Sequence, residues 1–462
     1  MEKSPIITHR ATLDYTLYLA KIVLYFRLLG LFEIDEKPLS KYLVVTLFRI
    51  FNWIVVTLIV VANVADFCIN IDNFYEVSYN LGYILPFLMT EFKSAVIYRQ
   101  QNKLRRLIND IHGPISLLKY SSDLGVLTII RTAIVFQNFD YTIFVIASIP
   151  VLGLGILPIK LFLRTREFPI RGSFPFNVTQ SPNFEIILGS QCYVLFIACI
   201  WILIFDTSLL GFIRWINVQL IILQANYRHC NDTSTSRASL SVSQQNYNII
   251  QAYQFLKVPE EQEEIRSFVP FTPEEANVAA DSFLLRFRAC VVHHRRLIDN
   301  LNDCNSLFTV VLFGQIFSSC ILICVGLFVL VVSLHENRNI FKDIVMLGIG
   351  LAHLFYWCIY GDQLMIENDK LWISIYECGW ENHLSKKSKR LILNGLTQGL
   401  TPMKMTAGAF FVFSMQTYLS VKAVLLIQYL PTFLNYYIKN IFFFEGYKNF
   451  VLLFRTSDQY GV

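Results

Sequence analysis

The stretch that decides the fold is Leu307–Ser333, which reads LFTVVLFGQIFSSCILICVGLFVLVVS and contains no charged residue. A helix needs about 20 predominantly apolar residues to cross the hydrocarbon core of a bilayer. A helix that is apolar on every side must be buried, either inside a large protein or in lipid. The sequence therefore predicts a membrane-spanning helix in this stretch.

Six further apolar runs accompany this one, and they make it the fifth of seven predicted spans. Hydrophobic residues form 54% of the 462 residues and charged residues only 16%, against about 25% charged residues in soluble domains. We therefore predict an all-α, polytopic membrane protein with seven transmembrane helices. The other six spans are Leu43–Ala65, Val77–Ile97, Tyr141–Leu163, Ile186–Gly211, Ile344–Ile366 and Met405–Leu434.

These spans divide the chain into seven regions. The longest loop begins with a polar, Ser-rich stretch, Thr233–Gln245, which predicts flexible chain. Further on, helical spacing of apolar residues predicts a cytoplasmic extension of the fifth span. The regions are a cytoplasmic N-terminal segment (1–42), helices one to four (43–224), a cytoplasmic loop with its helical extension (225–306), helices five and six (307–366), a cytoplasmic anchor segment (367–404), helix seven (405–434) and an atypical tail (435–462).

The distribution of Lys and Arg predicts the orientation, because cytoplasmic loops carry an excess of these residues. Basic residues are frequent in 1–42, 98–140 and 367–404, whereas the first loop, 66–76, holds three acidic residues and no basic one. The N-terminus is therefore expected in the cytoplasm. With seven spans, the C-terminus is expected outside the cell.

The third loop is the exception to this charge pattern. It carries Arg164, Arg166 and Arg171, although the orientation places it outside. It also contains Asn177-Val178-Thr179, a sequon for N-glycosylation, which requires an extracellular position. We predict that Asn177 is a glycosylation site and that this loop lies outside the cell. The basic residues of the other loops agree on this orientation and outnumber the three arginines.

Several classes of function lack their motifs here. The sequence contains no nucleophile elbow, phosphate-binding loop, HExxH motif or paired catalytic carboxylates, and its ten cysteines show no zinc spacing. His293 and His294 are adjacent, so on a helix they point about 100° apart and cannot chelate one ion. The net charge of +5 forms no basic stripe, so nucleic acid is not an expected partner. We expect a receptor, channel or carrier, with no enzyme activity, cofactor or metal.

Charged residues inside predicted spans are expensive and therefore informative. Glu91, Lys93 and Asp206 fall near the inner ends of their spans. They predict interfacial positions or bonds between helices, with a charged, water-filled path as the alternative. His353 inside the sixth span predicts a packing or pocket role.

Two motifs in the last third resemble those of insect odorant receptors. The first is YWCIYGDQL at 356–364, which ends near the inner end of the sixth span. The second is PMKMTAGAFF at 402–411, followed by Ser414 and then by TYLS at 417–420. The second motif matches the family signature of the last helix at about ten positions in order. The family's inverted topology agrees with the charge pattern.

Two other receptor classes are alternatives. G-protein-coupled receptors have seven spans but an outside N-terminus, and the sequence lacks Asp-Arg-Tyr after the third span and Asn-Pro-x-x-Tyr in the last. Gustatory receptors share the inverted topology, and Thr417-Tyr418 followed by Gln428-Tyr429 partly matches their last span. The Thr-Ala-Gly-x-Phe-Phe run favours odorant receptors.

The resemblance implies a subunit of an odorant-gated, non-selective cation channel. Such subunits form hetero-tetramers with a shared co-receptor in the plasma membrane, in dendrites of olfactory sensory neurons. The last helix would line the pore, and a volatile apolar odorant would bind in the outer half of the bundle through cavity shape and dispersion contacts. The expected pore residues are Phe410, Phe411, Ser414, Thr417 and Tyr418, and the expected ligand-binding residues are Tyr83, Phe87, Ser148, Tyr193, Phe196 and His353.

The chain departs from the family pattern after Ser420. Pro431 falls inside the last predicted span, where proline removes a helix hydrogen bond, and a tail continues to Val462. One hypothesis is that the tail is a translated intron. A spliced transcript that retains Lys422–Val462 would remove this hypothesis.

Overall fold

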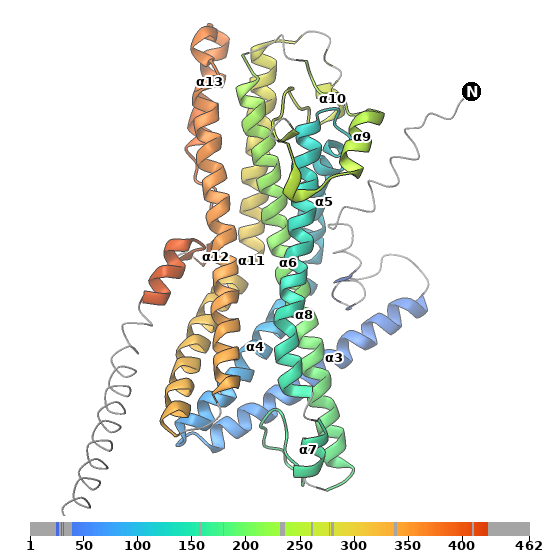
Figure 1. Cartoon of the computed structure of the whole chain (residues 1–462), viewed down its shortest axis with the longest axis vertical. Helices are drawn as coiled ribbons and strands as arrows, with labels where there is room; N and C mark the ends of the chain where they lie inside the picture. The colour runs from blue at the N-terminus through green and yellow to red at the C-terminus, as the bar shows by residue number, and fades with distance from the viewer. Residues whose placement is uncertain are drawn as a thin grey trace, which may run out of the picture.

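The computed structural model describes residues 39–423 and four residues near the N-terminus (25, 26, 29 and 31), with short gaps inside the main range at 157–158, 179, 232–235, 260–261, 277, 279–280, 337–339 and 409–410. The chain forms an elongated bundle of long helices (Figure 1). The long helices are α3 (Leu39–Ile69), α4 (Phe74–Arg99), α5 (Gln101–Leu118), α6 (Leu124–Ile156), α8 (Asn183–Arg228), α11 (Phe283–His335), α12 (Phe341–Tyr376) and α13 (Lys386–Gly399).

Shorter elements connect these helices. They include the two strands of one antiparallel hairpin, in which Thr406 faces Val412 and Ala407 faces Phe411. The short elements are α7 (Ile159–Thr165), α9 (Gln244–Gln251), η1 (Phe255–Lys257), α10 (Pro273–Ala276), η3 (Trp380–His383), β1 (Thr406–Ala407) and β2 (Phe411–Val412).

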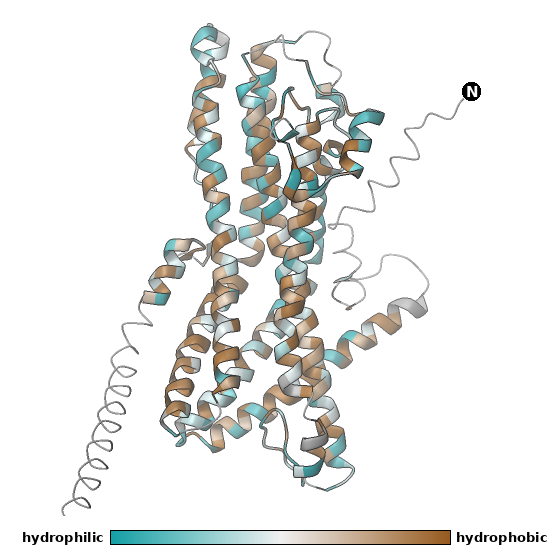
Figure 2. Ribbon diagram, viewed as in Figure 1, coloured by the Kyte–Doolittle hydropathy of each residue, from teal (hydrophilic) through white to brown (hydrophobic). Residues whose placement is uncertain are grey.

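Five of the described helices are long and apolar enough to cross a membrane: α3, α6, α8, α11 and α12. The second predicted span lies within α4, and most of the seventh lies outside the described residues. Apolar side chains dominate the half of the bundle that contains α7, whereas polar side chains are frequent around α5, α9 and α13 (Figure 2). The prediction of an all-α membrane protein is confirmed.

Helix α8 lies at the centre of the packing. Trp215, Ile216 and Leu220 are completely buried in its second half. There the amide Nε2 of Gln219 donates to the carbonyl of Ile111 at 3.1 Å, and Arg296 donates to Oε1 of Gln219 at 2.8 Å. Buried polar groups need such partners, so α5 and α11 are held against α8 beyond its most apolar part.

The third predicted span, for which an earlier start was an alternative, overlaps a helix that does begin earlier. Helix α6 begins at Leu124 and ends at Ile156, whereas Tyr141–Leu163 had been predicted. The helix begins earlier because Val126, Leu127 and Ile130 are buried against the rest of the bundle. Packing rather than lipid therefore stabilises its first turns, and hydropathy alone does not reveal them.

The predicted start of the last helix at Met405 is also wrong. Residues 406–407 and 411–412 pair as strands, and the helix begins at Met415. Gly408 adopts φ +64°, a left-handed conformation that glycine tolerates and that ends a helix. Phe413 N–H donates to the carbonyl of Met405 at 3.0 Å and closes the hairpin.

The Ser-rich stretch of the long loop, which the sequence predicts as flexible chain, packs against neighbouring elements in its described part. Ala238 is buried, and its N–H donates to the carbonyl of Phe268 at 2.9 Å. Arg237 binds Asp281, with Nη2 and Oδ1 2.7 Å apart, and Arg286 binds the other oxygen of Asp281 at 2.7 Å. Two arginines on one carboxylate thus hold this loop on the start of α11.

The third loop pairs two of its three arginines with carboxylates. Arg166 lies 3.0 Å from Glu185, and Arg171 contacts Glu76. These two arginines therefore hold the loop against the first turns of α8 and α4. Asn177 is exposed in the same loop.

Candidate functional site

A cavity of about 280 Å³ lies between α4, α8, α11 and α12. Its volume is near the lower end of the range for small-molecule sites, about 300–1,000 Å³. One end is marked by Ser78 and Asp343, near the first turns of α4 and α12, and the other end by Lys93 and His353. Ser78 and Lys93 are fifteen residues apart on α4, which corresponds to a separation of about 22 Å along the helix axis.

The wall formed by α4 is aromatic. The ring centroids of Tyr79 and Tyr83 are 5.5 Å apart, and those of Tyr83 and Phe87 are 6.3 Å apart. This follows from the i, i+4 spacing of the three residues, which places them on one helix face. Pro86 in the same wall is the helix-internal proline of α4.

Three of the six predicted ligand-binding residues line this cavity, namely Tyr83, Phe87 and His353. The other three do not. Ser148 donates to the carbonyl of Phe144 in its own helix at 2.8 Å, Tyr193 bonds Asn52 of α3, and Phe196 is 49% exposed. On the fourth predicted span, α8 turns Leu195, Ala198, Cys199 and Ile202 to the cavity, whereas Tyr193 and Phe196 lie outside it.

Sequence reasoning missed the whole contribution of α11. This helix is the fifth predicted span, which was not expected to contribute to the pocket, yet Gln315, Ser318 and Ser319 line the cavity. Gln315 is the single amide side chain of the apolar run Leu307–Ser333. Because polar side chains within membrane spans usually face protein, this feature could have indicated its position.

The polar end of the cavity is a buried ionic network. Lys93 Nζ lies 2.7 Å from Asp206 Oδ1, and His353 Nε2 lies 2.7 Å from Asp206 Oδ2. Asp206 is completely buried behind the wall, while Lys93 and His353 form part of it. Lys93 and Asp206 thus form the predicted bond between helices. The ammonium of Lys93 also lies 4.7 Å from the ring centroid of Phe205.

A second buried network lies farther along α12. Asp140 of α6 accepts hydrogen bonds from Arg214 of α8 at 2.6 Å and from Tyr356 at 2.6 Å, and it also bonds Tyr360. The ring of Phe144 lies edge-on to both His353 and Tyr356, at centroid distances of 6.1 and 5.5 Å. The two networks therefore share one face of α12.

Four of the five predicted pore residues lie within the described residues, while Phe410 lies outside them. Phe411 belongs to β2, and Ser414, Thr417 and Tyr418 mark the start of the last helix. The backbone N–H of Thr417 donates to Ser414 Oγ at 3.1 Å. Such a bond satisfies a free donor of the first turn, so Ser414 caps this helix.

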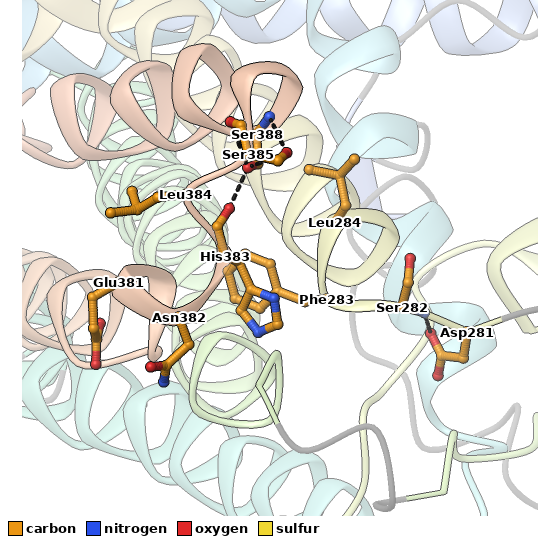
Figure 3. A pocket seen from close by; sticks show the side chains of 10 residues that line it. All are labelled: Asp281, Ser282, Phe283, Leu284, Glu381, Asn382, His383, Leu384, Ser385 and Ser388. Carbon is orange, nitrogen blue, oxygen red and sulfur yellow. Dashed lines mark hydrogen bonds between the residues drawn. The ribbon is translucent and has the colours of Figure 1, made fainter.

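A separate, open groove of about 770 Å³ lies where α11 begins and α12 ends. The rings of Phe283 and His383 stack in it with centroids 4.1 Å apart (Figure 3). Asp281 and Glu381 also line the groove. It lies outside the apolar half of the bundle and shares no lining residue with the cavity described above.

Comparisons with known proteins agree with this arrangement. Two solved structures are similar to the chain: the insect olfactory receptor OR5 from Machilis hrabei, and the same receptor in complex with eugenol. Their TM-scores are 0.68 and 0.67 at 13% identity; they cover 90% and 91% of this chain and 97% and 98% of theirs. At this identity the likeness shows the fold.

One curated relative, Odorant receptor 65a from Drosophila melanogaster, is 22% identical over 126 residues. The match spans 27% of this chain and 30% of the relative's length. A family model described as "7tm Odorant receptor" matches residues 73–424. That range contains every helix from α4 onward, both motifs of the last third and all residues of the cavity, and it confirms the family predicted from those motifs. The chain belongs to the odorant receptor family.

Proposed function

We propose that the chain is a subunit of an odorant-gated, non-selective cation channel. The observation that supports this most directly is the mostly apolar cavity between α4, α8, α11 and α12, within a chain of the odorant receptor family. Aromatic walls with few polar groups suit small apolar ligands. An odorant opens such a channel only when it binds the open state more tightly than the closed state.

Side-chain contacts connect the cavity with the start of the last helix. Trp357, one turn beyond His353 on α12, packs its ring on Phe413, with centroids 5.7 Å apart. Phe413 directly precedes Ser414, which caps the last helix. A ligand that shifts α12 at the cavity therefore moves the segment that begins the proposed pore helix.

The experiment is a current recording from cells that express the chain together with an odorant receptor co-receptor. We expect currents in response to volatile apolar compounds, and we expect Tyr83→Ala to change the ranking of those compounds without loss of surface expression. Phe196→Ala is the matched control, because Phe196 is an aromatic residue outside the cavity. A receptor that reaches the surface and yields no current with any volatile compound would contradict the proposal.

We further propose assembly with the co-receptor as a hetero-tetramer. Large apolar side chains are exposed on the part of the bundle beyond the apolar half, where lipid does not cover them. They include Val292 at 57%, Tyr376 at 58% and Leu393 at 64% exposure. Apolar surface of this kind marks protein interfaces. Co-purification of the two chains, compared with Leu393→Glu, tests the assembly.

For the membrane, we propose the plasma membrane, with the N-terminus and the α5, α9 and α13 end in the cytoplasm. The basic segments and the acidic first loop support this orientation. Epitope tags at each end of the chain, probed on intact cells, test it. Labelling of an N-terminal tag without permeabilisation would overturn the orientation.

A further inference from the structure

The end of the cavity near Lys93 and His353 offers hydrogen-bond donors that its own residues do not use. An ammonium group has three N–H donors. Among the described residues, Lys93 Nζ bonds one oxygen of Asp206, and the ring of Phe205 lies 4.7 Å away. Lys93 is 4% exposed and lines the cavity. Its remaining N–H groups therefore have no bulk water to satisfy them.

The charge of Lys93 is balanced at this end by its own partner. Nζ of Lys93 lies 2.7 Å from Asp206 Oδ1, so one cation and one anion form a pair. Nε2 of His353 lies 2.7 Å from the other oxygen of Asp206, and the amide nitrogen of Gln315 lies 3.4 Å from His353 Nδ1. Lys93 therefore carries no charge that a ligand has to neutralise.

The unused N–H donors of Lys93 and the charge of Asp206 together favour some classes of ligand over others. A hydrocarbon that fills this end of the cavity would leave the Lys93 donors without a partner, which is costly. A carboxylate would bring a second negative charge next to Asp206, which is also costly in a medium of low dielectric constant. A neutral oxygen that accepts a hydrogen bond meets neither penalty. The rest of the wall, between Tyr83 and the α11–α12 surface, accepts an apolar body.

We propose that this cavity recognises neutral volatile molecules with an apolar body and one carbonyl oxygen, which accepts a hydrogen bond from Lys93 Nζ. The inference rests on the proposed odorant-gated function and adds the ligand class. Lys93 is the residue that determines this preference. Asp206 and His353 act as positioning residues, because they hold the ammonium at the wall.

The test is a series of an alkane, an aldehyde, a methyl ketone and a carboxylic acid of one chain length, applied to the full chain expressed with its co-receptor. A hydrogen bond to a charged group changes affinity by roughly tenfold to a hundredfold. We expect the aldehyde and the ketone to act at concentrations lower than the alkane by that factor. The ionised acid is expected to be the weakest.

The matching variant combines Lys93→Met with Asp206→Asn, so that no buried charge is left alone. It should lose the preference for the carbonyl compounds over the alkane. Glu91→Gln is the control, because Glu91 lies on the same helix but bonds Thr57 of α3 at 2.7 Å and does not line the cavity. It should keep the preference.

The outcomes separate this inference from the proposed function. A response to the alkane equal to that of the ketone, a preference for the ionised acid, or an unchanged preference in the double variant would overturn the inference and leave the channel function intact. A surface-expressed channel silent to the whole series and to a broad volatile panel would overturn the proposed function. The series on the unaltered chain decides the inference even when the double variant fails to reach the surface.

Discussion

Trp357 and Phe413 pack their rings with centroids 5.7 Å apart and thereby join α12 to the segment that precedes the last described helix. Trp357 is 1% exposed and Phe413 is fully buried. The indole nitrogen of Trp357 also lies 3.4 Å from His353 Nε2 at the cavity. One residue pair thus connects the cavity wall with the start of the proposed pore segment.

The first prediction concerns Phe413. Phe413→Ala removes a buried ring, which costs about 3–5 kcal/mol of stability in a packed site. We expect a lower midpoint of thermal unfolding in detergent and a smaller maximal current, with the ranking of ligands unchanged. Phe413→Leu keeps most of the side-chain volume, so its thermal midpoint and maximal current should lie between those of the unaltered chain and Phe413→Ala. A changed ranking with full maximal current would contradict the coupling role.

The second prediction concerns Gly361, where α12 passes close to the same segment. A Cβ atom at this position would collide with the carbonyl group and the Cβ of Phe413. The collision is with backbone, so Gly361→Ala is expected to displace the segment and to reduce both surface expression and current. Gly348→Ala on the same helix is the control, since nothing lies within 4 Å of its added Cβ. Equal behaviour of the two variants would refute the close approach.

The third prediction concerns the ion pair of Asp140 and Arg214. Removal of one partner from a buried pair costs about 3–5 kcal/mol, because the other charge is left uncompensated. Arg214→Met alone should therefore lower the thermal midpoint strongly. Arg214→Met together with Asp140→Asn should recover part of the loss, since Asn still offers an oxygen to Tyr356. Additive losses in the double variant would show that the pair is not coupled.

The fourth prediction is a pH dependence of the loop that packs on α11. Burial opposes the charge of Asp281, but hydrogen bonds and charge from Arg237 and Arg286 outweigh it and lower the pKa of Asp281 to about 2. An Asp in unfolded chain has a pKa of about 3.9. The stabilisation is therefore present above about pH 4 and is lost as the pH falls from there toward 2.

Limited proteolysis or hydrogen exchange of residues 236–282 measures this effect. Protection should decline over that acidic window in the unaltered chain, and Asp281→Asn should show weak protection already at neutral pH. Glu274→Gln is the control, because Glu274 is an exposed carboxylate of the same segment. A loop as protected in Asp281→Asn as in the unaltered chain would contradict the role of the two arginines.

Much of the bundle follows from apolar runs, and the remainder depends on contacts that hydropathy does not report. Six predicted spans lie within or overlap α3, α4, α6, α8, α11 and α12. Helix α8 nevertheless continues beyond the predicted end at Gly211 to Arg228, because polar residues such as Gln219 and Asn226 bond neighbouring elements there.

The hairpin and the cavity could not be predicted from the sequence for a different reason. Gly408 lies in an apolar run that reads as helix, and only its positive φ and the pairing of β1 with β2 end that pattern. The Lys93–Asp206 pair was predicted only as one of several possible bonds, since two charges separated by 113 residues need tertiary packing to meet. Which face of α8 points inward is likewise decided by its neighbours.

Helix α11 has 53 residues and contains no proline. At about 1.5 Å per residue its length is roughly 80 Å, whereas the hydrocarbon layer is about 30 Å thick. More than half of the length of α11 therefore lies outside the hydrocarbon layer. Any tilt of the part within the membrane moves the distal end through a wider arc, so a small change beside the proposed ligand site would become a larger displacement at the proposed subunit contacts.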